Sequence, residues 1–293
     1  MEDDNKRDAV ISGFHVAKIL SAKAQEIIDV SLDLGMSQGQ VRSNGSAITF
    51  PNGSAIAITL LEKILKKRSE NDCFVVRDGE VEWMYIFGGN NSVYRLYEPR
   101  LDWPPTLSID GSYMHAIFKS TPLAEAELKV GALGDVRGKK VLDTCFGLGY
   151  TAQVLAARGA KSIVSCEKSE DTLEIAKSNP WSARALSDSR VSVRNEDAAD
   201  FLSGAKDGEF DLILHDPPTL KKGGDLYSGA FYRLMCAKLA EGGRLYHYIG
   251  TKDERQRKDY HSGAARRLKD AGFADVAESY RGLAALKEKT DAY

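Results

Sequence analysis

The sequence has few cysteines, no long apolar run and no marked excess of charge. Its four cysteines form no CxxC pair, which argues against a zinc site and against a secreted disulfide framework. No apolar run approaches the roughly 18 residues that a membrane span needs. The formal net charge of −2 gives no global argument for binding nucleic acid or membrane. The polar start "MEDDNKRDAV" is not a signal peptide, so we expect a reduced, soluble, cytoplasmic protein without metal.

The chain changes character near residue 105. Before it, two helical stretches (16–28 and 60–68) accompany short alternating segments, separated by Asn-Gly and Gly-Gly pairs that are typical of hairpins. This pattern predicts a small α+β domain over residues 1–105. Pro104 and Pro105 then forbid a helix. From residue 123 strand-like and helix-like segments alternate, which predicts a second domain over 106–293 with a doubly wound, mostly parallel sheet.

A glycine-containing loop follows the first strand of this second domain. Ligands of open parallel sheets bind beyond the carboxyl ends of the strands, which is where this loop lies. Gly147 and Gly149 permit a tight turn and a close backbone approach, and the helix from Tyr150 directs free N–H groups toward the same space. The loop also fits a GxGxx(G/A) dinucleotide fingerprint, with Glu167 ending the next strand, so a nicotinamide cofactor stays open at this point.

Acidic residues follow four successive predicted strands. Asp143 stands directly before the loop, where it would repel a pyrophosphate but suits the ammonium group of a bound amino acid. Glu167 is placed to accept hydrogen bonds from ribose hydroxyls. Asp197, next to Ala198, is placed to accept one from an adenine amino group, and Asp216 ends the fourth strand. Together with the glycine loop, this ordered set predicts a site for S-adenosyl-L-methionine.

The segments that carry these residues resemble the motifs of class I methyltransferases. "VLDTCFGLG" is similar to their first motif, with Cys145 in place of its first glycine, and "CEKS", "NEDA" and "HDPP" resemble the next three. The resemblance covers about residues 130–285 and implies a seven-stranded sheet. It also implies that Asp143, Gly147 and Gly149 hold the methionine end of the cofactor. Five segments further resemble a group of predicted archaeal methyltransferases with a DPP motif: "VLDTCFGLGYTA", "SNPWS", "HDPP", "LYSGAFYRL" and "GGRLYHYIG".

The tetrad His215-Asp216-Pro217-Pro218 is the candidate catalytic motif. The Asp216 carboxylate and the Pro217 carbonyl together would accept two N–H bonds from an aromatic amine and localise its lone pair. The prolines limit motion and leave no competing N–H. His215 is a candidate base near neutral pH, with a packed, hydrogen-bonded histidine as the alternative.

The residues around this motif give candidate substrate contacts. In the (D/N)PP(Y/F) motif of the resembled family, the aromatic residue stacks on the target base, but Thr219 stands in its place here. Tyr227, Phe231 and Tyr232 are candidates for the missing platform, with helix packing as the alternative. His115 precedes the first core strand, where methyltransferases often close over the cofactor, and is a further candidate.

The sequence leaves the acceptor and the exact activity open. RNA, a small molecule or polyamine, and a protein all stay open as the acceptor, and the basic segment 251–270 could contact phosphates, although it contains four acids. An aminopropyltransferase using decarboxylated S-adenosylmethionine is one rival, but "TCFGLGYT" lacks the more glycine-rich loop, usually GGGDG, of that group. A non-catalytic nucleotide-binding or RNA-binding module is the other. No membrane partner is expected, and the oligomeric state stays open.

Overall fold

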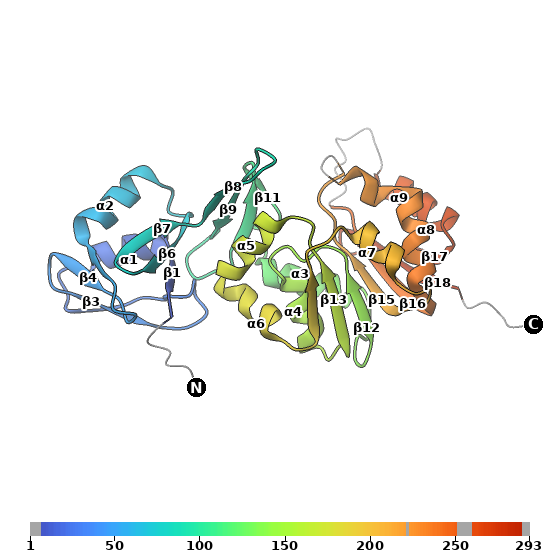
Figure 1. Ribbon diagram of the computed structural model, residues 1–293, viewed down its shortest axis with the longest axis horizontal. Coiled ribbons are helices and arrows are strands. Elements are labelled where there is room, and N and C mark those ends of the chain that lie inside the picture. Colours follow the sequence, from blue (N-terminus) through green and yellow to red (C-terminus); the bar gives the residue numbers. More distant parts are fainter. Residues whose placement is uncertain (1–6, 221–222, 251–259, 289–293) are drawn as a thin grey trace, which may run out of the picture. The chain divides into compact units, whose positions relative to one another are not determined.

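The computed structural model describes residues 7–220, 223–250 and 260–288 (Figure 1). The chain divides into two compact units. Unit 1 comprises Met1–Pro122 with Glu174–Ala183, and unit 2 comprises Leu123–Leu173 with Arg184–Tyr293. Each unit contains its own cluster of buried apolar side chains. The boundary expected at residues 105 and 106 stays a prediction.

Unit 1 contains three small sheets whose strands all pair antiparallel. The strand orders are β1-β6-β7, β2-β3-β4-β5 and β11-β10-β9-β8. Two helices, α1 (Gly13–Ser21) and α2 (Ile58–Lys67), accompany them. The strands are β1 (Ala9–Ser12), β2 (Ile27–Asp29), β3 (Gln40–Ser43), β4 (Ala47–Thr49), β5 (Ala55–Ala57), β6 (Cys73–Arg77), β7 (Glu80–Trp83), β8 (Tyr85–Phe87), β9 (Val93–Tyr97), β10 (Thr106–Ile109) and β11 (Ser112–Tyr113).

The prediction of a helix over residues 16–28 is wrong at the carboxyl-terminal end of that range. α1 stops at Ser21, and Ile27–Asp29 form strand β2 instead. Ile28 is buried and pairs with Val41 of β3. This burial and pairing outweigh the good helix propensity of the intervening residues, because propensity is a weak preference that tertiary contacts override. The helix expected over 60–68 is confirmed as α2.

Unit 2 is built on one seven-stranded sheet with the order β14-β13-β12-β15-β16-β18-β17. The first five strands of this order pair parallel, whereas β18 runs antiparallel to both β16 and β17. The strands are β12 (Lys140–Asp143), β13 (Ser162–Cys166), β14 (Val191–Arg194), β15 (Phe210–His215), β16 (Leu239–Tyr248), β17 (Phe273–Ser279) and β18 (Gly282–Lys287). The α/β class is confirmed, but the sheet is mixed, because only Tyr280 and Arg281 connect β17 to β18 and so short a connection cannot make a parallel crossover.

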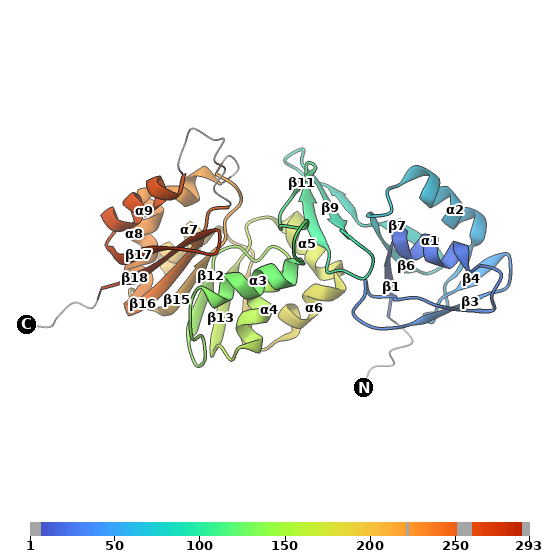
Figure 2. The same cartoon turned by 180° about the vertical axis from the view of Figure 1, so that it is seen from behind.

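Helices cover both faces of this sheet. On one face lie α7 (Ala198–Gly204), α8 (Gly229–Lys238) and α9 (Tyr260–Asp270) (Figure 1). On the other lie α3 (Pro122–Gly131) and α4 (Tyr150–Ala157) (Figure 2). The shorter α6 (Ala183–Ser187) follows α5 (Glu170–Ser178). No helix in the described part of the chain is long and apolar enough to cross a membrane.

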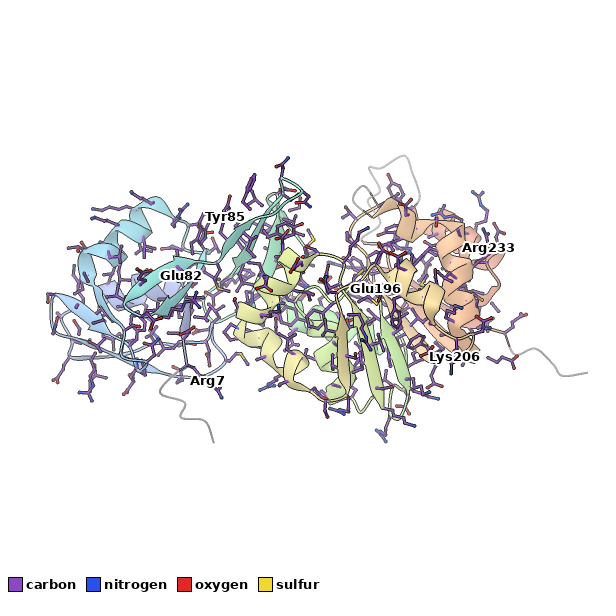
Figure 3. The ribbon with its side chains drawn as sticks, in the orientation of Figure 1. Arg7, Glu82, Tyr85, Glu196, Lys206 and Arg233 are labelled. Carbon is purple, nitrogen blue, oxygen red and sulfur yellow. The ribbon has the colours of Figure 1, made fainter. Side chains whose placement is uncertain are left out.

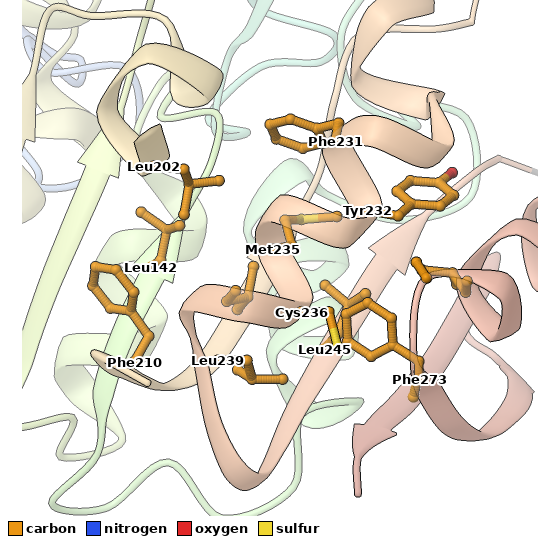
Figure 4. Close-up of a cluster of buried hydrophobic side chains, with 14 of the residues drawn as sticks. Leu142, Leu202, Phe210, Phe231, Tyr232, Met235, Cys236, Leu239, Leu245 and Phe273 are labelled. Carbon is orange, nitrogen blue, oxygen red and sulfur yellow. The ribbon is translucent and has the colours of Figure 1, made fainter. Parts of the chain in front are cut away.

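A buried cluster of unit 2 lies between α8 and the sheet (Figure 4). Phe231 and Met235 are four residues apart on α8, so they lie on one helix face. They pack with Leu142 of β12 and Leu245 of β16. Fully burying an apolar side chain of this size stabilises the fold by about 1.5–3 kcal/mol. This packing fixes the central strands, and with them the residues at their carboxyl ends.

Candidate cofactor and acceptor site

Asp143 ends β12 and is fully buried. Its Oδ2 accepts hydrogen bonds from the hydroxyls of Thr151 and Ser165, both at 2.9 Å. Its Oδ1 is buried without a hydrogen-bond partner among the described residues. Burial raises the pKa of Asp143 to about 7, and the two hydroxyls oppose that shift. Because buried polar atoms are almost always paired, the bare Oδ1 indicates an acceptor kept for a ligand.

The loop after β12 takes a shape that needs its glycines. Gly149, the N-cap of α4, has φ +74°, and a Cβ there would lie 2.6 Å from the Phe146 ring. Gly147 has φ +54°, and the position of its missing Cβ is open space. Cys145 is not among the residues with positive φ, so its side chain does not strain the loop. The loop therefore offers open space beside its backbone, which fits a bound ligand.

Glu167 connects this loop to the end of β13. Its Oε2 accepts the N–H of Gly147 at 3.0 Å, and its Oε1 accepts the N–H of Ser169 at 2.9 Å. Burial raises the pKa of Glu167, and these N–H groups oppose the rise. Each carboxylate oxygen has a second lone pair, so the group retains capacity to accept ribose hydroxyls.

Asp197 has a structural role that the sequence did not reveal. It is the N-cap of α7, with its Oδ1 accepting the N–H of Ala199 at 2.8 Å, and its Oδ2 pairs with the exposed Lys168 at 2.9 Å. Burial alone would raise the pKa of Asp197, but Lys168 and the helix N–H outweigh it and lower the pKa. Ala198, the first residue of α7, is buried. A contact of Asp197 with adenine stays a prediction.

Asp216, directly after β15, forms an ion pair with a buried lysine from α3. Lys129 Nζ lies 2.6 Å from Asp216 Oδ2, and its side chain is 3% exposed. Burial alone would lower the pKa of Lys129, but Asp216 and Glu125 outweigh it and raise the pKa. The other oxygen of Asp216 makes no hydrogen bond to a described residue, so it is available to an acceptor group.

Further charged and aromatic groups extend this pair into a network. Glu125, one helical turn before Lys129, lies 3.9 Å from the lysine Nζ, and Arg281 lies 3.4 Å from the other Glu125 oxygen. The Lys129 Nζ also lies 4.1 Å from the centroid of the Tyr248 ring, a cation–π contact. The two acids and two bases balance, so the network around Asp216 carries no net charge.

His215 is packed into the core of unit 2. It is fully buried, with Nδ1 at 2.8 Å from the Thr144 hydroxyl and Nε2 at 3.0 Å from the Leu226 carbonyl. Burial lowers the pKa of His215 to about 3. Because a neutral ring donates through one nitrogen and accepts through the other, the ring is satisfied as it stands. This arrangement leaves no ring nitrogen for a base, and it is the packed alternative that the sequence allowed.

The two prolines and Tyr227 form one rigid unit. Pro217 is buried, Pro218 is exposed, and the Tyr227 hydroxyl donates to the Pro218 carbonyl at 3.1 Å. Tyr227 is buried, and burial raises its pKa. The structure thus brings Tyr227 to the motif as a support for its backbone. Its role as a stacking platform stays a prediction.

The remaining candidates pack elsewhere. Phe231 lies 5.1 Å from the His215 ring, and the Tyr232 hydroxyl lies 2.8 Å from His247 Nε2 in a buried pair, so both serve the core. Tyr150 is buried at the start of α4. His115 belongs to unit 1, where its Nδ1 lies 2.8 Å from the Thr106 hydroxyl, and its substrate role stays a prediction. Of the basic segment 251–270, residues 251–259 lie outside the described residues.

Lys129 and Glu125 are the site residues that sequence reasoning missed. Their spacing of four is the only signal, and such a pair usually marks a solvated helix face. Here the pair stands beside Ala126 and Val130, which are buried, so the face that carries it turns inward. No group of three or more His, Cys, Asp or Glu side chains within the described ranges could hold a metal ion.

Comparison with known proteins agrees with this geometry. An uncharacterized protein of Methanocaldococcus jannaschii, MJ1233, is 36% identical over 93% of this chain and 93% of its own length. The chain belongs to the family of MJ1233. A family described as "Conserved hypothetical protein 95" also matches residues 124–245, which include both Lys129 and Asp216.

Solved structures extend the comparison for this member of the MJ1233 family. A spermidine synthase in complex with the transition-state analogue AdoDATO has a TM-score of 0.57 at 18% identity, over 72% of this chain and 77% of that one. A putative S-adenosylmethionine-dependent methyltransferase from Listeria monocytogenes has a TM-score of 0.43 at 17% identity, over 57% of this chain and all of that one. The chain is similar in fold to that spermidine synthase over the share of its length that the likeness covers.

Proposed function

We propose that the protein is an S-adenosylmethionine-dependent methyltransferase of the DPP-motif group that acts on a nitrogen of RNA or of a small molecule. The observation that supports this most is the bare Oδ1 of Asp143 beside the open glycine loop. A buried carboxylate oxygen without a partner needs a donor, and the ammonium group of an amino-acid moiety is one. On this proposal residues 1–105 form an accessory domain that helps position the acceptor.

The residues at the carboxyl edge of the sheet fit the cofactor. Asp143 would hold its ammonium group, Glu167 its ribose and Asp197 its adenine, while Gly147 and Gly149 keep the space beside the loop open. When bound, S-adenosylmethionine supplies a methyl group activated by a sulfonium. The task left to the protein is to align and orient the acceptor, since methyl transfer by in-line displacement needs no metal.

Asp216 would orient that acceptor. Lys129 occupies one of its carboxylate oxygens, which leaves the other oxygen to accept an N–H from the acceptor. An ionised carboxylate in this position stabilises positive charge that develops on the attacking nitrogen. Because Lys129 and Arg281 balance Asp216 and Glu125, the network favours a neutral acceptor over a polyamine cation.

A spermidine-synthase-like aminopropyltransferase is the second candidate, and one observation favours it. The likeness to spermidine synthase covers 72% of the chain, which is more than unit 2 contains, so it extends into unit 1. The charge balance around Asp216 and the loop sequence favour methyl transfer instead. Calorimetric titration with S-adenosylmethionine and with its decarboxylated form separates the two proposals by which donor binds more tightly.

The direct test is transfer of a tritiated methyl group into RNA, protein and small-molecule fractions. We expect label in the RNA or the small-molecule fraction, and a loss of about 100-fold or more for Asp216→Asn with cofactor binding retained. Asp211→Asn is the matched control, because Asp211 stands at the start of the same strand, where it accepts the N–H of Lys140. Equal losses in the two variants, or labelling of the protein fraction alone, would contradict the proposal.

A further inference from the structure

One face of the β11-β10-β9-β8 sheet in unit 1 carries aromatic and basic side chains. Residues directly opposite each other on neighbouring antiparallel strands share a face. Tyr113 pairs with Ser108, Ser108 pairs with Arg95, and Arg95 pairs with Tyr85, so these four side chains form one row across the sheet. Strand alternation adds Phe87, Val93, Tyr97 and Thr106 to this side. We call six residues of this side the aromatic face: Tyr85, Phe87, Arg95, Tyr97, Ser108 and Tyr113.

A flat stack stands at one edge of the aromatic face. The rings of Trp83 and Tyr85 lie 4.4 Å apart and are tilted by only 16°. The Arg68 guanidinium lies 3.8 Å from the centroid of the Trp83 ring, so it must occupy the opposite side of that ring from Tyr85. Among the described residues no second ring or cation stacks on Tyr85, whose position on β8 is marked in Figure 3. The stack therefore ends in the Tyr85 ring, which is partly exposed.

A second aromatic pair continues the face across the sheet. Tyr97 and Tyr113 have ring centroids 4.6 Å apart, and the Arg95 guanidinium lies 5.5 Å from the Tyr97 ring. Arg95 is also paired with the buried Asp72 at 3.1 Å, which fixes the guanidinium and neutralises it. Phe87, at the rim, is 62% exposed. The face thus presents rigid, partly exposed planar groups.

Two buried polar atoms at this face have no partner. Only four side-chain atoms among the described residues are buried and without a hydrogen bond, and they include Ser108 Oγ and Trp83 Nε1. Ser108 stands between Tyr113 and Arg95 in the row described above. Such atoms are rare in folded proteins. Ser108 is fully buried, so its Oγ lies beneath the aromatic side chains rather than at the surface.

The charge beside the stack is positive. α2 ends in Lys66 and Lys67, followed by Arg68, and none of the three forms an ion pair with a described residue. The acid nearest in sequence to Trp83, Glu82, is itself paired with Arg77 at 2.7 Å. A partner that combines flat, hydrogen-bonding groups with negative charge would match the stack and these cations.

We propose that the aromatic face binds the unpaired bases of a single-stranded nucleic acid, while Lys66, Lys67 and Arg68 contact its phosphates. Every base has a π-face that stacks on tyrosine. An apolar protein partner would leave the cations unmatched. If the protein is the proposed methyltransferase, this binding favours RNA over a small molecule as the methyl acceptor, and that part of the inference rests on the proposed function. The binding of single-stranded nucleic acid itself does not depend on the proposed function.

Fluorescence anisotropy with the full chain tests the inference without any cofactor. The probes are labelled oligouridylate and oligothymidylate of about a dozen nucleotides, a length within the usual site size for single strands. We expect binding that weakens as salt rises, because phosphate contacts release counterions. Binding of oligouridylate alone identifies RNA as the ligand. Equal binding of oligouridylate and oligothymidylate identifies single-stranded nucleic acid of either kind as the ligand.

Two variants of the face are compared with one control. Tyr85→Leu removes the stacking ring, and Arg68→Gln removes a cation, so each is expected to weaken binding by about tenfold. Leu186→Ala changes an apolar residue of unit 2 with 37% exposure and is expected to bind as the parent does. Thermal unfolding of each variant establishes that it is folded.

Three results would overturn the inference: no binding of either probe, unchanged binding in both Tyr85→Leu and Arg68→Gln, or an equal loss in Leu186→Ala. Its failure is distinguishable from failure of the proposed function. Asp143→Asn is expected to lose S-adenosylmethionine binding and keep oligonucleotide binding, whereas Tyr85→Leu is expected to do the reverse.

Discussion

Glu98 in unit 1 and Asp143 in unit 2 are both buried carboxyl groups that no lysine or arginine contacts. Burial raises the pKa of Glu98 to about 8 and that of Asp143 to about 7. Both oxygens of Glu98 are used, since the Ser12 hydroxyl donates to Oε2 and the Asp102 N–H donates to Oε1 at 3.0 Å. Asp143 uses only one.

This difference separates a structural acid from the acid that we propose binds the cofactor. A raised pKa follows from burial in either setting and therefore does not by itself mark a site. An acceptor atom left over after the fold has satisfied the rest does mark one, because the fold alone would not leave it bare. Asp216 differs from both Glu98 and Asp143, because Lys129 compensates the charge of its carboxylate. One oxygen of Asp216 then stays available to a ligand.

The largest effect is expected where a buried charge loses its partner. Lys129→Met leaves Asp216 without its cation and Glu125 with Arg281 alone, which should cost about 3–5 kcal/mol of unfolding free energy in denaturant titrations. Adding Asp216→Asn should restore part of that loss. A Lys129→Met variant as stable as the parent would show that Lys129 does not compensate these acids.

Glu98→Gln tests the structural member of the pair. The pKa of Glu98 is raised from 4.5 to about 8 in the folded chain, so the folded state binds more protons than the unfolded state between these values. Stability from this group is full below about pH 4.5 and is lost as pH rises to about 8, by an amount on the order of 4 kcal/mol. Unfolding titrations across this range should show a flatter profile in Glu98→Gln.

The same variant also serves as a control for binding. Because both oxygens of Glu98 are used within unit 1, Glu98→Gln should leave the affinity for S-adenosylmethionine unchanged. A loss of affinity for S-adenosylmethionine in Glu98→Gln would contradict the distinction between Glu98 as a structural acid and Asp143 as the acid proposed to bind the cofactor.

Binding of S-adenosylmethionine should depend on pH through Asp143. Only the ionised carboxylate attracts an ammonium group strongly, and the pKa of Asp143 is raised from 3.8 to about 7 by burial, against the hydroxyls of Ser165 and Thr151, with Asp216 adding to the rise. Affinity should rise by about tenfold per pH unit up to about pH 7 and then level off. Calorimetry between about pH 5.5 and 8 measures this. A flat profile would mean that Asp143 does not bind the ammonium group.

The smallest effect is expected at Tyr227. Tyr227→Phe removes one hydrogen bond to the Pro218 carbonyl and keeps the buried ring. The expected loss is about 1 kcal/mol of stability, measured by thermal or denaturant unfolding. A loss several times larger would indicate that the hydroxyl has more partners than this carbonyl.

Several parts of the site could be predicted from the sequence. Asp143, Glu167, Asp197 and Asp216 all follow strands as expected, because alternating segments locate the carboxyl ends of strands well. Side-chain partners could not be predicted. Lys129 and Asp216, whose side chains form an ion pair, are 87 positions apart in the sequence. The role of Asp197 as an N-cap depends on the residue at which α7 begins. The helix over 16–28 failed for a related reason, since β2 exists only through its pairing with β3.

The most direct test of the central claim is calorimetric titration of S-adenosylmethionine into the parent chain, Asp143→Asn and Asp216→Asn. We predict tight binding by the parent, a loss of at least about tenfold in Asp143→Asn, and nearly unchanged binding in Asp216→Asn. Parent-like binding by Asp143→Asn would contradict the claim that the bare oxygen of Asp143 holds the cofactor.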